Sequence, residues 1–118
     1  MTNDFFPDNS RELDRWRHEL APAQHEAWRA FSKATFAAGA LDEKTKQLIA
    51  IAVAHATQCP WCITGHTKGA AKAGATPEEI MEAIWVAAEM RSGAAYAHST
   101  YALRTLEEEQ QREREAAD

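Results

Sequence analysis

Residues Leu48 to Ala54 form an uninterrupted apolar run, and this run constrains the fold more than any other feature. A helix that is apolar on every side must be covered on every side. The run is far too short to cross a bilayer, and a chain of 118 residues has little room to enclose a helix completely. We therefore expect a homo-oligomer, in which Trp85, Val86 and the small residues around 93–97 add to the interface. The alternative is a central core helix within a monomer.

Start and stop signals for helices recur along the chain, and no segment alternates apolar and polar residues as a strand does. Asn9 is a candidate cap for the first helix, and Ser92-Gly93 indicates a break or bend late in the chain. The fold class predicted is all-α, a single helical bundle over residues 1–118. We expect N-terminal helices over 9–39, a core over 40–105 and a charged helix end over 106–118. About six helices are predicted: 9–20, 22–39, 42–58, 60–74, 76–91 and from 94 into the tail.

Composition excludes several classes of function. The formal net charge is −5, so the chain has no basic surplus with which to displace counterions from a nucleic acid. No apolar stretch has the length of a signal peptide or a membrane span, and we expect a cytoplasmic protein that does not bind membranes. The chain has only two cysteines, three residues apart, which is not the pattern of a disulfide scaffold.

Those cysteines belong to the segment Cys59-Pro60-Trp61-Cys62, and His66 follows one helical turn later. Pro60 is suited to the first turn of a helix, which would put Cys59 at the N-cap. At about 100° per residue, Cys59, Cys62 and His66 then fall within roughly 60° of one another on the helix surface. A thiolate stabilised by a helix N-terminus, a second thiol and an imidazole on one face are the parts of a thiol redox site.

The spacing does not settle which cysteine attacks. The free amides at the helix start favour Cys59, whereas the contact with His66 one turn away favours Cys62. His55, four residues before Cys59, is a further candidate for proton transfer, and Trp61 is expected to shield the sulfurs. The remaining residues His18, His25 and His98 have no partner nearby in sequence, and we interpret them as ordinary.

Other readings of the motif exist. The first alternative is that the cysteine pair is inert packing in a helical core. Zinc is the second alternative, since Cys59, Cys62, His66 and His55 are suitable ligand types, although structural zinc sites usually join two well-separated pairs. A thiol-dependent step on an electrophilic small molecule is the third.

From Lys46 to Tyr101 the sequence resembles the carboxymuconolactone decarboxylase superfamily, and within it the alkylhydroperoxidase D-like branch. The resemblance rests on the apolar helix, on Cys59-x-x-Cys62-x-x-x-His66, on Ala-Gly-Ala-Thr at 73–76 and on the helix start at 78–80. It implies an all-helical fold and assembly into trimers or hexamers. It also implies that Cys62 is oxidised by the peroxide, that Cys59 resolves the sulfenic acid as a disulfide, and that His66 relays protons. We expect no cofactor.

One position departs from that branch. A glutamate usually lies twelve residues before the first cysteine and serves as the base of the relay, and here the residue is Gln47. An amide cannot take up a proton near neutral pH. His55 lies on the same predicted helix, about 80° around from Gln47. We hypothesise that His55 replaces the acid while Gln47 keeps a hydrogen-bonding role, and Glu43 is a weaker substitute.

The function predicted is that of an alkylhydroperoxidase-like oxidoreductase. It would reduce hydroperoxides through Cys62 and Cys59 and be regenerated by an unidentified dithiol donor. The competing prediction is a non-catalytic oligomeric module that senses redox state or binds a metal.

Overall fold

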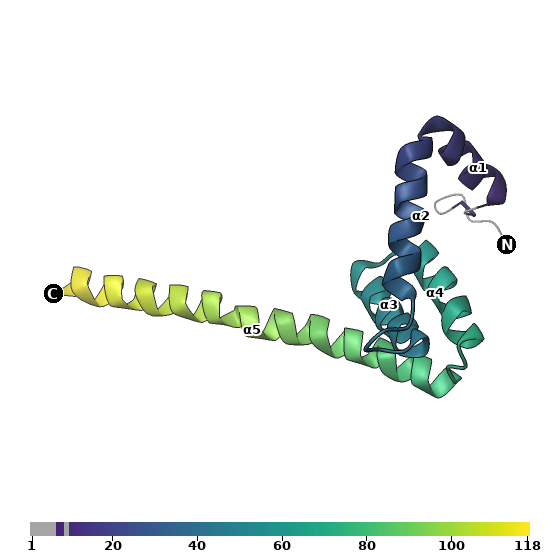
Figure 1. Ribbon diagram of the computed structural model, residues 1–118. Coiled ribbons are helices and arrows are strands. Elements are labelled where there is room, and N and C mark those ends of the chain that lie inside the picture. Colours follow the sequence, from purple (N-terminus) through teal and green to yellow (C-terminus); the bar gives the residue numbers. More distant parts are fainter. Residues whose placement is uncertain (1–6, 9) are drawn as a thin grey trace.

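The chain folds into α-helices only, in a computed structural model that describes residues 7, 8 and 10–118. The all-α fold class is therefore confirmed, and no strand occurs in these residues. Figure 1 shows a cluster of helices from which the last one projects far to one side. The described part contains five helices: α1 (Arg11–Leu20), α2 (Pro22–Phe36), α3 (Glu43–Thr57), α4 (Pro60–Lys72) and α5 (Pro77–Ala117).

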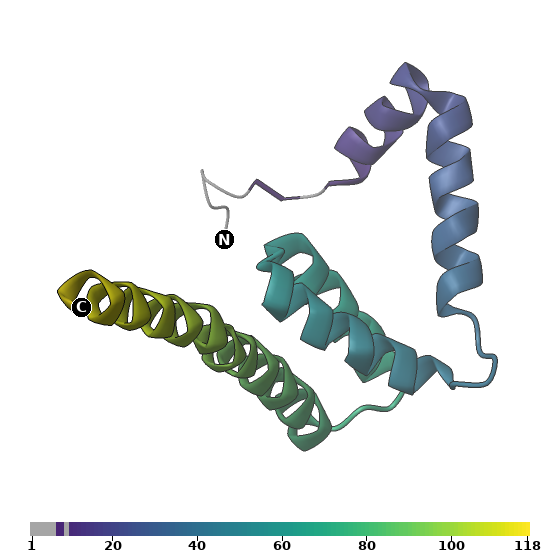
Figure 2. The same ribbon diagram turned by 90° about the vertical axis from the view of Figure 1, so that its left-hand side faces the viewer.

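The core is centred on α3, which packs against both α4 and the first part of α5 (Figure 2). Ile51 and Ala54 of α3 are buried, together with Ala70 of α4 and Ala87 of α5. Small residues on α4 and α5 let both helices approach the apolar run of α3. Ile49 and Val53, on the other side of this run, remain about half exposed. A single chain thus covers only one side of the run.

Two polar contacts fasten α5 to α3. Near the start of both helices, Lys44 Nζ forms an ion pair with Glu79 Oε2 at 2.8 Å. About three helical turns further along α5, Arg91 Nη1 donates to the carbonyl oxygen of Ala56 at 2.8 Å. The second contact satisfies a carbonyl in the last turn of α3, where a cation is also favoured by the helix dipole.

The start and end of α4 follow from local chemistry as predicted. Pro60 occupies the first turn, where its missing N–H costs nothing. At the other end Gly74 adopts a φ of 93°, and the amide of Ala75 bonds to the carbonyl of Ala70. This is the Schellman arrangement that glycine favours. The end of α3 was also placed correctly, since Gln58 takes a left-handed φ of 57° directly before Cys59.

Two helix boundaries differ from the prediction. The side chain of Ser10 caps α1 by accepting from the amide of Leu13, while the expected cap Asn9 lies outside the described residues. Helix α2 ends at Phe36 and not at Gly39. The reason is Lys46, whose ammonium donates to the carbonyl oxygens of Thr35 and Ala37. A lysine from α3 thereby satisfies carbonyls that a longer helix would have used.

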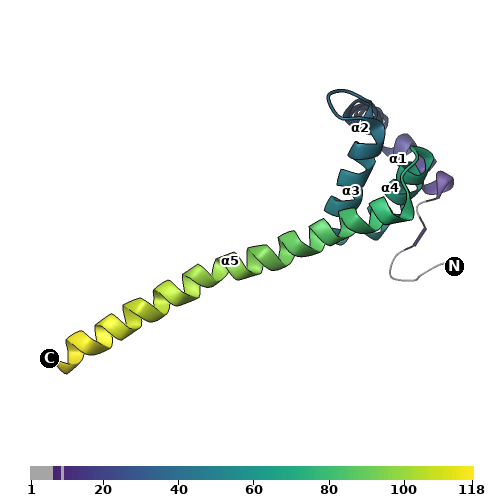
Figure 3. The same ribbon diagram turned by 90° about the horizontal axis from the view of Figure 1, so that it is seen from below.

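The predicted break at Ser92-Gly93 is wrong, because α5 runs through it without interruption (Figure 3). The Ser92 hydroxyl bonds back to the carbonyls of Ala88 and Glu89, so it is satisfied inside the helix. A glycine within a helix costs only about 1 kcal/mol relative to alanine. The alanine-rich turns on both sides of Gly93 favour helix strongly enough to offset that cost. Five helices result where about six were expected.

The single chain is much less compact than an independent domain. Its radius of gyration is 21.8 Å, whereas about 13 Å is typical of a compact domain of this length. Its accessible surface is 9780 Å², against about 6,400 Å² for a compact monomer of this mass. None of the described helices is apolar over a length sufficient to cross a membrane.

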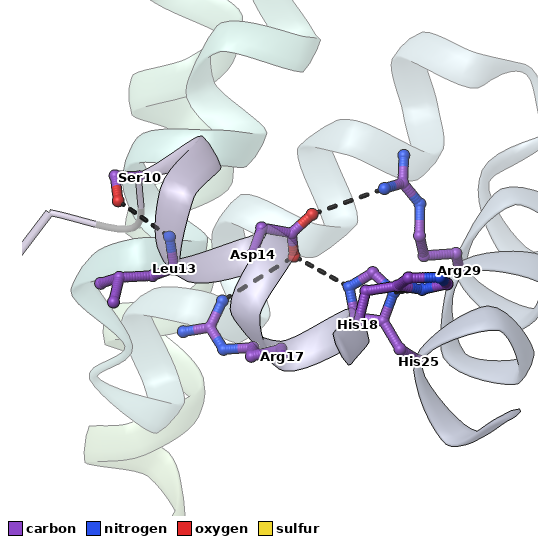
Figure 4. A network of polar contacts seen from close by, with 7 residues as sticks. All are labelled: Ser10, Leu13, Asp14, Arg17, His18, His25 and Arg29. Carbon is purple, nitrogen blue, oxygen red and sulfur yellow. Dashed lines mark hydrogen bonds and ion pairs between the residues drawn. The ribbon is translucent and has the colours of Figure 1, made fainter. Parts of the chain in front are cut away.

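Helices α1 and α2 are joined by a polar network (Figure 4). Asp14 Oδ1 accepts from His25 Nε2 at 3.0 Å, and its Oδ2 faces Arg29 Nη1 at 3.4 Å. His25 in turn lies 3.2 Å from His18, measured between the two Nδ1 atoms. The His25 side chain is only 10% exposed. His18 and His25, which the sequence presented as ordinary, therefore connect the two helices.

We expect Asp14→Ala to loosen α1 from α2. The hydrogen bond from His25 lowers the pKa of Asp14 below its ordinary value of 3.8. The stability that the Asp14 carboxylate gives to the contact between α1 and α2 is thus complete above pH 3.8 and is lost as the pH falls through the lowered pKa. Amide hydrogen exchange should become faster in α1 and stay unchanged in α3 and α4. Glu19→Ala, on the same helix, is the matched control, and equal exchange in both variants would contradict the role of Asp14.

Candidate redox site

The two cysteines form a disulfide at the start of α4. Their Cα atoms are 5.3 Å apart, which is within the range that a disulfide bridges. Cys59 is the N-cap residue, and its Sγ accepts a hydrogen bond from the amide of Cys62 at 3.3 Å. The positive end of the helix dipole therefore lies at Cys59, where it would stabilise a thiolate in the reduced protein.

Cys62 and His66 border one apolar groove of about 420 Å³ on the surface of the chain. We call it the Cys62 groove. Its walls come from α2, α3 and α4, and its lining is Thr35, Phe36, Lys46, Ile49, Ala50, Val53, Ala54, Thr57, Cys62 and His66. Cys59 is not among these residues. The groove thus gives a small molecule access to one cysteine of the pair, the one that lies one turn from the histidine.

His66 is held by two contacts. Its Nδ1 lies 2.9 Å from Gln47 Oε1, and its ring stacks on Phe36 with 4.8 Å between the centroids. Since an amide oxygen only accepts, the proton of the neutral imidazole is on Nδ1 and the lone pair is on Nε2. Burial lowers the pKa of His66 below its ordinary value of 6.5. At neutral pH the ring is therefore uncharged, with a free base position at Nε2.

Gln47 borders a second cleft, of about 650 Å³, which shares Phe36 with the Cys62 groove. Glu43, one turn earlier on α3, borders the same cleft together with Lys72 and Gly69. Gln47 borders this cleft and contacts His66, which borders the Cys62 groove. Glu43 and Gln47 thus line one cleft, and neither of them borders the Cys62 groove.

His55 is oriented differently from the other candidates. Its Nδ1 lies 2.8 Å from the carbonyl oxygen of Ile51 on its own helix. It does not border the Cys62 groove. The disulfide, the Cys62 groove and the His66–Gln47 contact link Cys59, Cys62, His66 and Gln47, and none of these three features includes His55. Within the described residues, no three His, Cys, Asp or Glu side chains are grouped so that they could hold a metal ion.

Trp61, between the cysteines, is partly exposed. Its indole N–H donates to the carbonyl oxygen of Pro7 at 2.8 Å. It also borders a charged cleft of about 920 Å³ that lies mainly along α1 and α2. Although that cleft is larger than the Cys62 groove, neither cysteine nor His66 lines it, and we assign the chemistry to the groove.

Phe36 is a site residue that the sequence did not identify. It comes from α2, thirty positions before the histidine on which it stacks. The sequence placed Phe36 on an apolar helix face, which is equally typical of an ordinary core residue. Only the packing of α2 against α3 brings its ring to the Cys62 groove.

The fold and the site define a class of all-helical proteins with a Cys-x-x-Cys pair at a helix N-terminus and a histidine one turn later. Residues 22–106 match the sequence profile of the carboxymuconolactone decarboxylase family, and the chain belongs to this family.

Individual relatives agree with this assignment. An uncharacterized protein of the cox locus of Paracoccus denitrificans is 70% identical over 83 residues, covering 70% of this chain and 75% of that protein. A carboxymuconolactone decarboxylase family protein of Legionella pneumophila has a similar structure, with a TM-score of 0.62 and 40% identity over 67% of this chain and 70% of that one. A protein of Methanobacterium thermoautotrophicum gives a TM-score of 0.66 and 35% identity, covering 70% of this chain and 92% of that one.

Proposed function

We propose that this protein is a thiol peroxidase of the alkylhydroperoxidase D-like type, which reduces organic hydroperoxides. The observation that carries the proposal is the Cys62 groove, in which Cys62 and His66 face one apolar space while Cys59 is bonded to Cys62. The walls formed by Ile49, Ala50 and Val53 suit the apolar chain of an organic peroxide.

In the first step the Cys62 thiolate attacks the terminal oxygen of the hydroperoxide. An S–O bond forms and the O–O bond breaks, so that the peroxide is reduced to an alcohol and Cys62 is oxidised to a sulfenic acid. His66 takes the thiol proton at Nε2 and returns it to the departing alkoxide. Cys62 is assigned this role because it borders the groove and Cys59 does not.

In the second step the Cys59 thiolate attacks the sulfur of Cys62. The S–S bond forms, the S–O bond breaks, and hydroxide leaves and is protonated to water. The N-cap position of Cys59 suits this role, since the helix start stabilises its thiolate. An external dithiol then reduces the disulfide and returns the protein to its starting state.

Gln47 fixes the orientation of His66 but cannot receive its proton. The relay therefore stops at His66, unless His55 supplies the missing base as hypothesised. His55→Ala tests that hypothesis, because unchanged peroxide turnover and unchanged thiol pKa values would exclude His55 from the relay.

The proposal is tested by counting thiols. Fully reduced protein mixed with one equivalent of cumene hydroperoxide should lose both thiols and release one equivalent of cumyl alcohol. Retention of both thiols at excess peroxide would rule out a peroxidase.

A redox sensor is the second candidate function, and Gln47 is the observation that favours it. A site without the acid would be oxidised once but would turn over slowly, since general acid–base help is typically worth about 10²–10⁴-fold. Sustained turnover with an excess of a small dithiol such as dithiothreitol would separate a peroxidase from a sensor.

The active protein, we further propose, is a homo-oligomer, and the resemblance to the family implies a trimer or hexamer. Large apolar side chains lie on the surface of α5, where Trp85 is 68% and Val86 60% exposed. The excess accessible surface of the single chain supports the same proposal.

We expect the protein to sediment at a multiple of its 13.1 kDa mass. Trp85→Glu places a charge on an apolar surface and should shift the population toward monomer. Gln110→Glu, in the polar end of α5, should leave the mass unchanged. Analytical ultracentrifugation measures both, and a wild-type monomer would overturn the proposal.

A further inference from the structure

Gly69 lies on α4 one turn after His66, and its missing side chain faces Gln47. A Cβ atom placed on Gly69 would lie 2.8 Å from both Cδ and Oε1 of Gln47, and 3.0 Å from Nε2. Non-bonded atoms of this kind normally stay about 3.5–4.0 Å apart. The amide of Gln47 therefore rests directly on the backbone of α4, in space that any other residue at position 69 would fill.

We propose that Gly69 is a positioning residue, which leaves the slot through which Gln47 reaches His66. Its effect on peroxide reduction rests on the proposed function, whereas the slot itself rests on geometry alone. Gly69 touches neither cysteine in this scheme and acts only through the amide of Gln47. Glycine is the least favourable residue of a helix interior apart from proline, and the space taken by Gln47 accounts for its presence at position 69.

The slot matters because His66 has one hydrogen-bond partner in the described structure, the Gln47 amide. The stack on Phe36 restrains the plane of the ring but not the position of its proton. If the amide moves away, Nδ1 loses its acceptor and the proton is free to occupy Nε2, the atom needed as base. A single methyl group on Gly69 would thus act on the tautomer of His66 without touching it.

A matched pair of glycines on α4 separates this effect from a change in helix stability. A Cβ on Gly65 would meet nothing within 4 Å, whereas one on Gly69 would meet Gln47. Both substitutions to alanine favour the helix. The atoms displaced by Gly69→Ala are the end of a flexible side chain, so this variant should fold with a melting temperature no lower than that of the wild type.

The experiment compares Gly69→Ala with Gly65→Ala by ring ¹⁵N NMR of His66 and by the rate of Cys62 oxidation with cumene hydroperoxide. We expect Gly69→Ala to shift the tautomer signals and to slow oxidation about 10-fold, and Gly65→Ala to change neither. Wild-type tautomer signals in Gly69→Ala would overturn the proposal that Gln47 needs the space above Gly69 to reach His66. Shifted signals with an unchanged rate would overturn the positioning role.

A double variant completes the test. In Gln47→Ala the amide is already absent, so adding Gly69→Ala should change neither the tautomer signals nor the rate. If Gly69→Ala alone fails to fold, the double variant should recover folding, because the added Cβ then has room. A double variant that stays unfolded would contradict the proposal. If cumene hydroperoxide oxidises no thiol of the wild-type protein, the proposed function is wrong. The NMR comparison still tests whether Gly69 positions Gln47.

Discussion

Cys62→Ser is expected to abolish hydroperoxide reduction, with no thiol lost and no alcohol formed at any peroxide concentration. The remaining thiol, Cys59, lies at the N-cap of α4 and is absent from the lining of the Cys62 groove. A serine hydroxyl is not a nucleophile at neutral pH, and Cys59 does not border the groove that holds His66. We expect kcat/KM to fall at least about 10³-fold, measured by release of cumyl alcohol.

Cys59→Ser is the matched control, since it removes the other sulfur of the same disulfide. It should consume one equivalent of peroxide and then stop, with Cys62 held as a sulfenic acid that dimedone traps. Mass spectrometry should find the dimedone adduct on Cys62 in this variant and none in Cys62→Ser. The reverse pattern would give the attacking role to Cys59, as the helix N-terminus alone would favour.

The redox motif was predictable from sequence because its geometry is local. Cys59, Cys62 and His66 lie within about two turns at the start of one helix, so the period of the helix alone places them on one face. Pro60 fixed where that helix begins. The contact between His66 and Gln47 joins two helices, and the sequence pointed to it only through the resemblance to a family.

Contacts between separate helices account for most of what the sequence did not predict. Phe36 and the Asp14–His25 pair look ordinary in sequence, and only the packing of α2 and α1 gives them partners. The break expected at Ser92 had local support, yet the serine hydroxyl is satisfied inside the helix. Local signals thus predicted the helix starts well. They did not predict the contacts that join one helix to another, nor the bond from the Ser92 hydroxyl back to its own helix.

Gln47→Glu is expected to strengthen the site, which makes it the most informative single change. The carboxylate would occupy the same slot above Gly69 because it has nearly the same shape as the amide. At 2.9 Å from Nδ1 it would stabilise the imidazolium, whereas the present amide does so only weakly. The pKa of His66, now lowered by burial, should rise, and the Cys62 thiolate paired with it should become more abundant at neutral pH.

We expect the rate constant for Cys62 oxidation to rise on the order of 10-fold to 100-fold in Gln47→Glu, because the relay regains a group that accepts a proton. Stopped-flow measurements between pH 5 and 8 should show the gain together with a His66 titration moved to higher pH. Glu43→Gln is the control, since Glu43 lies one turn before Gln47 on α3 and borders the same second cleft. It should leave the rate unchanged. If Gln47→Glu gives no gain, the wild-type relay already contains a base, and a loss in His55→Ala or in Glu43→Gln would show which residue supplies it.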